Sequence, residues 1–182
     1  MWKYKAGRLL KQCAVMLVFH SCTLNAQVLS PFAQEDHERV KIGLFSPADV
    51  IEISHIYSEP EAINVDFRGV DGSSISIAEF GQVGSSLPKV ISVFKGGFKE
   101  RTLLMLIVKW YFYLPGVDTD ADYYEIHVFN ISKNPENGIH FSRNEFLSHI
   151  FGSGFDGRHE GERTYFRYKD AISVKQKLKE LE

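Results

Sequence analysis

The strongest hydrophobic pattern in the chain is the run from Leu103 to Leu114, in which every residue except Lys109 is apolar or aromatic. A helix that crosses a bilayer needs about 20 such residues, so this run is too short to span a membrane and instead predicts a long central β-strand. Side chains alternate between the two faces of a strand. The even-numbered residues form a wholly apolar face, whereas the odd-numbered face becomes more polar at Lys109, Tyr111 and Tyr113.

Shorter runs of alternating or β-branched residues predict further strands. These runs cover residues 40–45, 50–57, 63–67, 74–80, 123–131 and 163–168. Turn-forming residues occupy 69–72, with the sequence Gly-Val-Asp-Gly, and residues 115–122 are predicted to form the loop after the central strand. Connections this short join antiparallel neighbours, so the strands are predicted to form a meander.

Two segments fit either a helix or a strand. Residues 47–57 begin with Pro47 directly after Ser46, a pair that resembles a helix N-terminus, although the β-branched residues that follow favour a strand. The residues that flank 87–95 favour a helix by capping, whereas the β-branched residues inside this segment favour a strand. The pattern leaves both alternatives open.

Two helices are predicted near the C-terminus. Ser142 and Glu145 form a capping box in front of an apolar group that ends at Gly152. Asp170 is placed to cap a second helix. The apolar stripe of that helix consists of Val174, Leu178 and Leu181. The whole pattern therefore predicts an α+β domain, in which a meander-like antiparallel β-sheet of about six to seven strands carries one or two C-terminal helices on one face.

The first 26 residues have the three-part pattern of a secretory signal peptide. A basic region comes first, with Lys3, Lys5, Arg8 and Lys11. It is followed by an apolar run from Cys13 to Phe19 and by Ala26, a small residue suited to cleavage. An amphipathic N-terminal helix is the alternative. We predict that residues 1–26 are a signal peptide and that 27–182 form a single exported domain, either periplasmic or secreted.

Both cysteines, Cys13 and Cys22, lie within the predicted signal peptide. Cleavage after Ala26 would therefore leave a domain without a disulfide, which a chain of this length can tolerate because it can bury an adequate core. A lipid anchor on Cys22 is the alternative, but the residues before it, Phe19 to Ser21, fit the usual lipoprotein signal poorly. Disulfide scaffolds and cysteine nucleophiles are not expected.

Charge narrows the range of partners. The full chain has a formal net charge of −2, from 21 Lys and Arg against 23 Asp and Glu. Removal of the basic residues of the signal peptide leaves 17 basic residues and a net charge of −6. Proteins that bind nucleic acids are typically basic, so a nucleic-acid partner is not expected.

The central strand and the strand that follows it are predicted to pair as a hairpin. The expected register pairs Tyr113 with Tyr123, Tyr111 with Glu125 and Lys109 with His127. This pairing would place aromatic and charged side chains together on one face, a composition typical of binding surfaces. An ordinary solvent-facing sheet, or a face covered by the C-terminal helices, is the alternative.

The predicted loop of this hairpin is acidic, with Asp118, Asp120 and Asp122 at alternate positions. A calcium-binding loop opens in this way, but an EF-hand would need Gly where Tyr123 stands and Glu where Phe129 stands. We therefore expect a solvated acidic loop without a metal ion. Such a loop could block a basic cleft in a partner protein.

The remaining motifs give little support for catalysis. Residues 152–157 match G-x-G-x-x-G, but they follow a predicted helix, whereas a dinucleotide site needs a strand before the motif and a helix after it. A flexible loop is predicted there instead. The chain contains neither G-x-S-x-G nor H-E-x-x-H, and its histidines lack metal-ligand spacing. Binding is therefore favoured over enzymatic activity, and no cofactor is expected.

These patterns predict an exported protein-binding module, of the inhibitor or immunity type, that blocks another exported protein. The predicted contact residues are Lys109, Tyr111, Tyr113, Asp118, Asp120, Asp122, Tyr123, Glu125 and His127. One alternative is a small periplasmic hydrolase that uses Glu125 or Asp122 with His127. The other is an envelope protein that binds calcium or carbohydrate.

Overall fold

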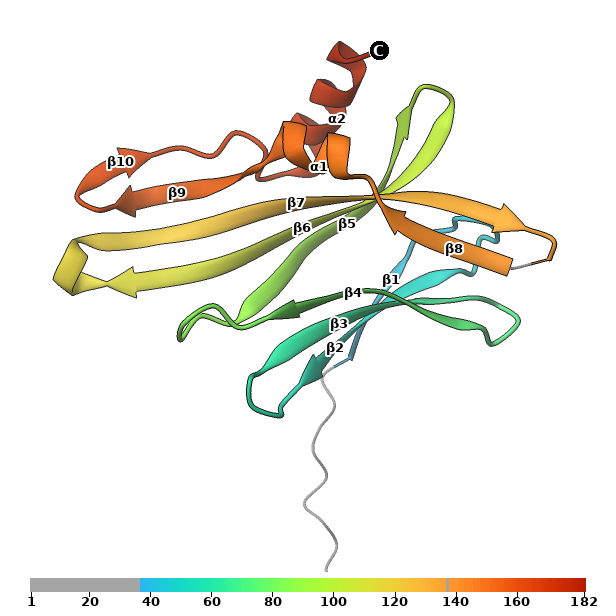
Figure 1. The fold of residues 1–182 in the computed structure, drawn as a ribbon, viewed down its shortest axis with the longest axis horizontal. Helices are drawn as coiled ribbons and strands as arrows, with labels where there is room; N and C mark the ends of the chain where they lie inside the picture. Colours follow the sequence, from blue (N-terminus) through green and yellow to red (C-terminus); the bar gives the residue numbers. More distant parts are fainter. Residues whose placement is uncertain (1–36, 137) are drawn as a thin grey trace, which may run out of the picture. The chain divides into compact units, whose positions relative to one another are not determined.

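The computed structural model describes residues 37–136 and 138–182. The predicted signal peptide, its cleavage site at Ala26 and the alternative lipid anchor at Cys22 lie outside the described residues. Within them, ten strands in two antiparallel sheets and two α-helices confirm the predicted α+β fold (Figure 1). Neither of these helices has the length and apolar character needed to cross a membrane.

The first sheet is a four-stranded antiparallel meander. Its strands follow the chain order: β1 (His37–Lys41), β2 (Val50–Ile56), β3 (Ala62–Arg68) and β4 (Ser74–Gly81). The ambiguous segment 47–57 is thus mainly a strand. Ser46 and Asp49 close a tight turn before it, in which the Asp49 carboxylate accepts hydrogen bonds from the backbone N–H groups of Phe45 and Ser46, both at 2.7 Å.

The second sheet has the strand order β10-β9-β7-β6-β5, and β8 pairs with the outer half of β7. Its strands are β5 (Pro88–Phe98), β6 (Arg101–Leu114), β7 (Thr119–Asn134), β8 (Gly138–Arg143), β9 (Ser153–His159) and β10 (Glu162–Thr164). The predicted central strand is confirmed as β6, and segment 87–95 lies in a strand. The flexible loop predicted at 152–157 is wrong, because this segment pairs with β7 as strand β9.

Strand β6 is buried on both faces over its first half, from Leu103 to Val108. Its even-numbered residues pack in one core cluster with residues of the first sheet, such as Phe67 and Phe80. Its odd-numbered residues pack in a second cluster with the helices. The two sheets therefore lie face to face, and the helices cover the opposite face of the second sheet. This arrangement explains why the apolar run of β6 is nearly continuous.

The helices α1 (Glu145–Phe151) and α2 (Ala171–Glu180) occupy the predicted positions. Asp170 caps α2 as predicted, because its Oδ1 accepts the Ser173 backbone N–H at 2.8 Å. The predicted capping box of α1 is wrong. Ser142 still belongs to β8, and Asn144 is the cap, accepting the Leu147 backbone N–H at 3.0 Å. Strand pairing through Arg143 delays the start of the helix.

Candidate binding surface

The β6–β7 hairpin has a different register from the predicted one. It pairs Leu114 with Thr119, Tyr113 with Asp120, Tyr111 with Asp122 and Lys109 with Tyr124. The hairpin closes through a single 3-10 turn, η1 (Pro115–Val117), followed by Asp118 in the left-handed conformation with φ 47°. Because this connection is shorter than the predicted loop over 115–122, every pair is shifted by three positions. An odd shift moves each side chain of β7 to the other face.

The predicted single patch of contact residues is therefore wrong, and its members lie on two opposite faces. Lys109, Tyr111 and Tyr113 share the face covered further along by the helices, together with Asp120 and Asp122. The other face is directed towards the first sheet. It holds Tyr123, Glu125 and His127, on the same side as Trp110 and Phe112.

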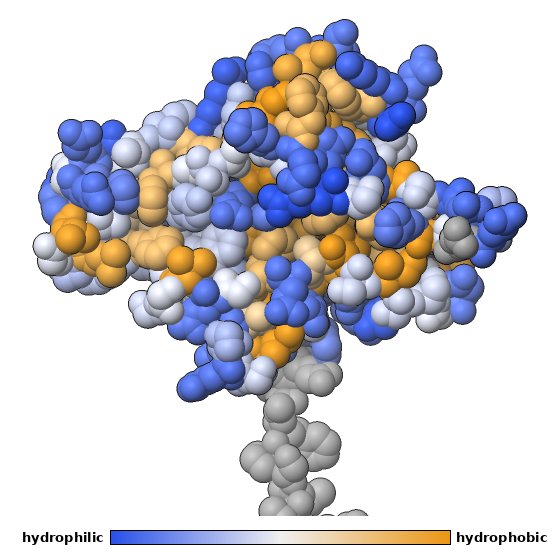
Figure 2. Space-filling view, viewed as in Figure 1, coloured by the Kyte–Doolittle hydropathy of each residue, from blue (hydrophilic) through white to orange (hydrophobic). Residues whose placement is uncertain are grey.

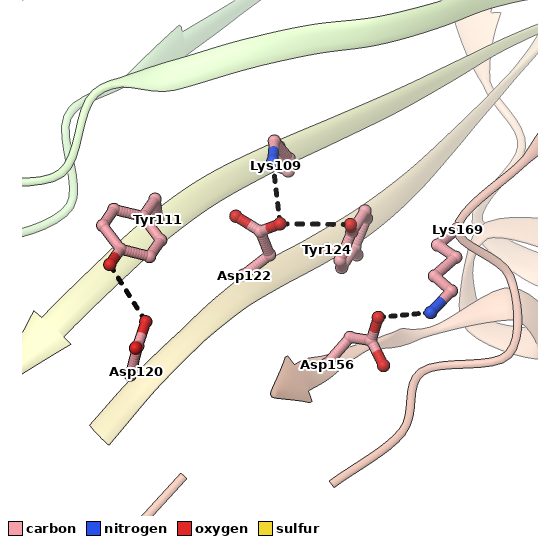
Figure 3. Close-up of polar contacts among 7 residues, drawn as sticks. All are labelled: Lys109, Tyr111, Asp120, Asp122, Tyr124, Asp156 and Lys169. Atoms are coloured by element: carbon pink, nitrogen blue, oxygen red, sulfur yellow. Dashed lines mark hydrogen bonds and ion pairs between the residues drawn. The ribbon is translucent and has the colours of Figure 1, made fainter. Parts of the chain in front are cut away.

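On the first of these faces, the acidic residues are paired with neighbouring side chains (Figure 3). Asp122 lies 2.7 Å from the Lys109 Nζ and accepts the Tyr124 hydroxyl at 3.3 Å. Asp120 accepts the Tyr111 hydroxyl at 2.9 Å. On β9, an equivalent ion pair joins Asp156 to Lys169. Asp120 and Asp122 are thus strand residues with fixed partners, where the sequence predicted a solvated loop.

The tyrosines of this network keep their protons over the ordinary pH range. Burial, followed by the charge of Asp122, raises the pKa of Tyr124 to about 12. The hydrogen bond to Asp120 is the main cause that raises the pKa of Tyr111. Both hydroxyls therefore remain hydrogen-bond donors to Asp120 and Asp122, which fixes the orientation of these rings.

Beyond the paired residues, the end of the hairpin exposes a group of apolar and aromatic side chains. We refer to Tyr111, Tyr113, Leu114 and Val117 as the hairpin tip. Tyr113 is 63% exposed and Val117 is 56% exposed, and Figure 2 shows hydrophobic residues gathered at the end of the molecule where this hairpin turns. Adjacent exposed residues of this type mark interaction sites more often than single ones do.

The turn of the hairpin tip is tied to the neighbouring β9–β10 turn. The Gly161 backbone N–H donates to the Asp118 carbonyl at 3.0 Å, and the Glu160 backbone N–H donates to the Thr119 hydroxyl at 3.0 Å. Arg158 forms an ion pair with the Asp118 carboxylate at 3.1 Å. Asp118 and Glu160 both have positive φ, at 47° and 51°, a costly backbone conformation that is held by such contacts.

A shallow depression of about 440 Å³ lies between the two turns. Its lining combines one exposed aromatic ring with charges of both signs: Tyr113, Asp118, Asp120, Arg158 and Arg163. The arrangement can accept a protruding side chain from another molecule. Together with the hairpin tip, it places exposed apolar and charged groups side by side.

The opposite face is mostly closed. His127 is only 4% exposed; its ring packs against Phe80 with 4.7 Å between the ring centroids, and its Nε2 lies 3.0 Å from the Glu125 carboxylate. This hydrogen bond is the main cause that lowers the pKa of Glu125. The Tyr123 hydroxyl contacts the Ser153 hydroxyl at 2.7 Å. His127 is therefore a buried residue, and the expectation that it belongs to an exposed surface is wrong.

The side chains named for hydrolysis are only partly brought together. Glu125 and His127 are in contact, but Asp122 lies on the other face of β7 and is engaged by Lys109. Among the residues that the structure describes, no group of three or more His, Cys, Asp or Glu side chains is arranged to hold a metal ion. Asp118, Asp120 and Asp122 do not converge, because the first is in a turn and the others point from a strand towards separate partners.

Sequence reasoning missed several residues of this surface. Leu114 and Val117 flank the Pro115-Gly116 pair, a turn signal that predicts an exposed hairpin end if the turn is taken as short. Arg158 and Glu160 lie in a segment without hydrophobic alternation, so no local pattern indicated that this segment contacts the hairpin tip. Comparisons of the chain with known protein families, with curated proteins and with solved structures find no match.

Proposed function

We propose that the protein is an exported protein-binding module that docks another exported protein on its hairpin tip and on the adjoining β9–β10 turn. An inhibitor or immunity-type role, in which the tip blocks a site on the partner, is the form of binding that we favour. The proposal of export depends on the N-terminal sequence pattern, and the proposal of binding depends on the surface.

The observation that supports the proposal is the rigid presentation of exposed apolar side chains. Binding is weakened by the entropy lost when mobile loops and side chains become ordered. Here the Tyr111 ring is held by Asp120, and the turn at Asp118 is held by hydrogen bonds from the backbone N–H groups of Gly161 and Glu160. Much of the ordering that a partner would otherwise impose is therefore already present in the free protein.

The composition of the surface also favours a protein partner. Tyrosine is enriched at the energetic centres of protein interfaces, and Tyr111 and Tyr113 stand beside exposed Leu114 and Val117. Charged residues, including Asp118 and Arg163, line the adjoining depression, and polar residues of this kind are typical of the rim of an interface.

The experiment is affinity capture from the exported-protein fraction of the source organism, with quantitative mass spectrometry. The wild-type chain is compared with Tyr113→Ala and Val117→Ala, and with Ile172→Ala as a matched control. Ile172 is 80% exposed but lies on α2. Truncation of a central interface residue costs about 2 kcal/mol or more, so each tip variant should weaken binding of the captured partner by at least about tenfold.

The control variant should bind the same partner as tightly as the wild-type chain does. Equal binding by the wild-type chain and both tip variants would place the interface elsewhere and overturn the proposal. Circular dichroism of each variant checks that a loss of binding does not reflect a loss of folding.

A further inference from the structure

A second site lies where strand β7 changes its neighbour. Residues 120–125 of β7 pair with β9, and residues 129–134 of the same edge pair with β8. Between them, α1 supplies the partners: the Val128 N–H donates to the Ser148 hydroxyl at 3.2 Å, and the Ile126 N–H donates to the Gly152 carbonyl at 3.4 Å. Because a helix cannot follow the strand edge closely, this crossing leaves a pocket.

The pocket has a volume of about 230 Å³ and a polar lining. Its side chains come from β7, from the end of β8 and from α1 and the start of β9, and include Glu125, His127, Arg143, Glu145, His149 and Ser153. Pockets for drug-sized ligands typically have about 300–1,000 Å³ and mainly apolar walls. The size and lining therefore fit a small polar molecule better than a large or apolar one.

Glu125 offers hydrogen-bond acceptors to the pocket. The hydrogen bond from His127 and the charge of Arg143 contribute to keeping the pKa of Glu125 below its usual value, so this carboxylate is ionised at neutral pH. Its side chain is 34% exposed, and a carboxylate has lone pairs for several donors, so it can still accept from a ligand. His127 Nε2 lies 3.0 Å from this carboxylate and holds it in position at the pocket wall.

Arg143 offers hydrogen-bond donors to the same pocket. The Arg143 guanidinium is about half exposed and lies 3.3 Å from Glu145, whose side chain is 79% exposed. Ion pairs as exposed as this one contribute little and exchange readily, so Arg143 can turn to a ligand carboxylate with which it forms a bidentate contact. The exposed hydroxyl of Ser153 lies in the same lining.

We propose that this pocket binds a small zwitterion of the α-amino-acid type, with its ammonium group at Glu125 and its carboxylate at Arg143. The balance of charge selects this class, because the fixed charges of Glu125, Glu145 and Arg143 are of both signs. A simple anion would meet two carboxylates, and a simple cation would meet the guanidinium. The site is separate from the hairpin tip and does not depend on the proposed protein-binding function.

The test is isothermal titration calorimetry of the full chain at neutral pH with glycine and alanine. Acetate and methylamine serve as probes that each carry only one of the two charges. Glycine or alanine should bind at least about tenfold more tightly than either single-charge probe, because each charged contact contributes separately. Acetate or methylamine binding as tightly as both amino acids would overturn the proposal, as would the absence of heat from all four.

Variants assign the two ends of the ligand. Arg143→Gln and Glu125→Gln should each weaken binding of glycine by about tenfold or more, whereas Arg101→Gln, an exposed residue at the start of β6, should not change it. Unchanged affinity in Arg143→Gln would refute the assignment. This side chain is half exposed, so Arg143→Gln should fold and remain informative even if Glu125→Gln does not.

Discussion

Glu52 is a charged residue that the fold has almost removed from water. It is 5% exposed in the middle of the first sheet, and its two carboxylate oxygens lie 2.7 Å from Arg39 Nη2 and 2.6 Å from Arg68 Nε. The hydrogen bond from Arg39 is the main cause that lowers the pKa of Glu52 below its usual 4.5. Burial of a carboxylate is unfavourable unless such partners are present, so this cluster joins three neighbouring strands.

Glu52→Gln should lower the free energy of unfolding at pH 7 by about 1–3 kcal/mol, because the amide carries no charge to attract the two guanidinium groups and its NH2 group cannot accept a hydrogen bond from either of them. The folded-state pKa is depressed, so the contribution of Glu52 is fully present above its unfolded pKa and is lost as the pH falls through the lower folded value. Urea denaturation between pH 7 and pH 3 should therefore show a shallower loss of stability with acid in Glu52→Gln than in the wild-type chain.

The control for this measurement is Glu79→Gln, because Glu79 is exposed on β4. Its free energy of unfolding should remain within about 0.5 kcal/mol of the wild-type value. If the free energy of unfolding falls equally between pH 7 and pH 3 in Glu52→Gln and in the wild-type chain, the contacts with Arg39 and Arg68 do not stabilise the ionised form of Glu52.

At the scale of the element, hydrophobic periodicity predicted most strands and both helices correctly. The errors come from the ends of elements and from strand β9, whose sequence lacks hydrophobic alternation. A strand pattern shows which residues share a face, but it does not contain the conformation of the turn. The left-handed backbone of Asp118 shortened the β6–β7 connection and moved Tyr123, Glu125 and His127 to the other face. The same limitation applies to α1, where pairing of β8 decided the position of the cap.

The two possible caps of α1 give a direct prediction. Asn144→Ala should lower the free energy of unfolding by about 0.5–2 kcal/mol, because the Leu147 N–H loses its acceptor. Ser142→Ala should change it by less than about 0.5 kcal/mol, because Ser142 is an exposed residue of β8. Urea denaturation of both variants distinguishes them.

Asn144→Asp keeps the acceptor for the Leu147 N–H but loses the donor to Asn130 Oδ1 at 2.9 Å, so it should recover only part of the lost stability. If Ser142→Ala lowers the free energy of unfolding more than Asn144→Ala does, Ser142 caps α1, as the sequence pattern predicted.

At the scale of the whole molecule, the described residues belong to one compact unit in which β6 contributes to two core clusters. The sequence predicted the α+β class and the helices, but it predicted one sheet where the structure has two. Periodicity identifies a buried face without identifying what covers it. The near-continuous apolar run of Leu103–Val108 was the signal that both faces of β6 are covered.

Because the sheets share a core, they should unfold together. Phe67 of the first sheet is fully buried between the sheets, and Phe67→Ala should lower the free energy of unfolding by about 3–5 kcal/mol. Trp110, on β6 in the second sheet, reports the transition by fluorescence in a Trp2→Phe background, which leaves it as the single tryptophan. The denaturation curve followed by Trp110 fluorescence should shift by the same amount as the curve followed by far-UV circular dichroism. An unshifted fluorescence curve would mean that the second sheet unfolds independently.

Strand β7 extends over 16 residues and is bordered on one edge by β9, α1 and β8 in turn. The same edge of β7 therefore pairs with two separate parts of the chain, the β9–β10 arm and strand β8. An insertion at the outer end of the β9–β10 arm would leave the register of β8 unchanged, and a longer turn between β7 and β8 would leave the other arm in place. The two sides of the molecule can thus diverge in length independently, while the common core remains constant.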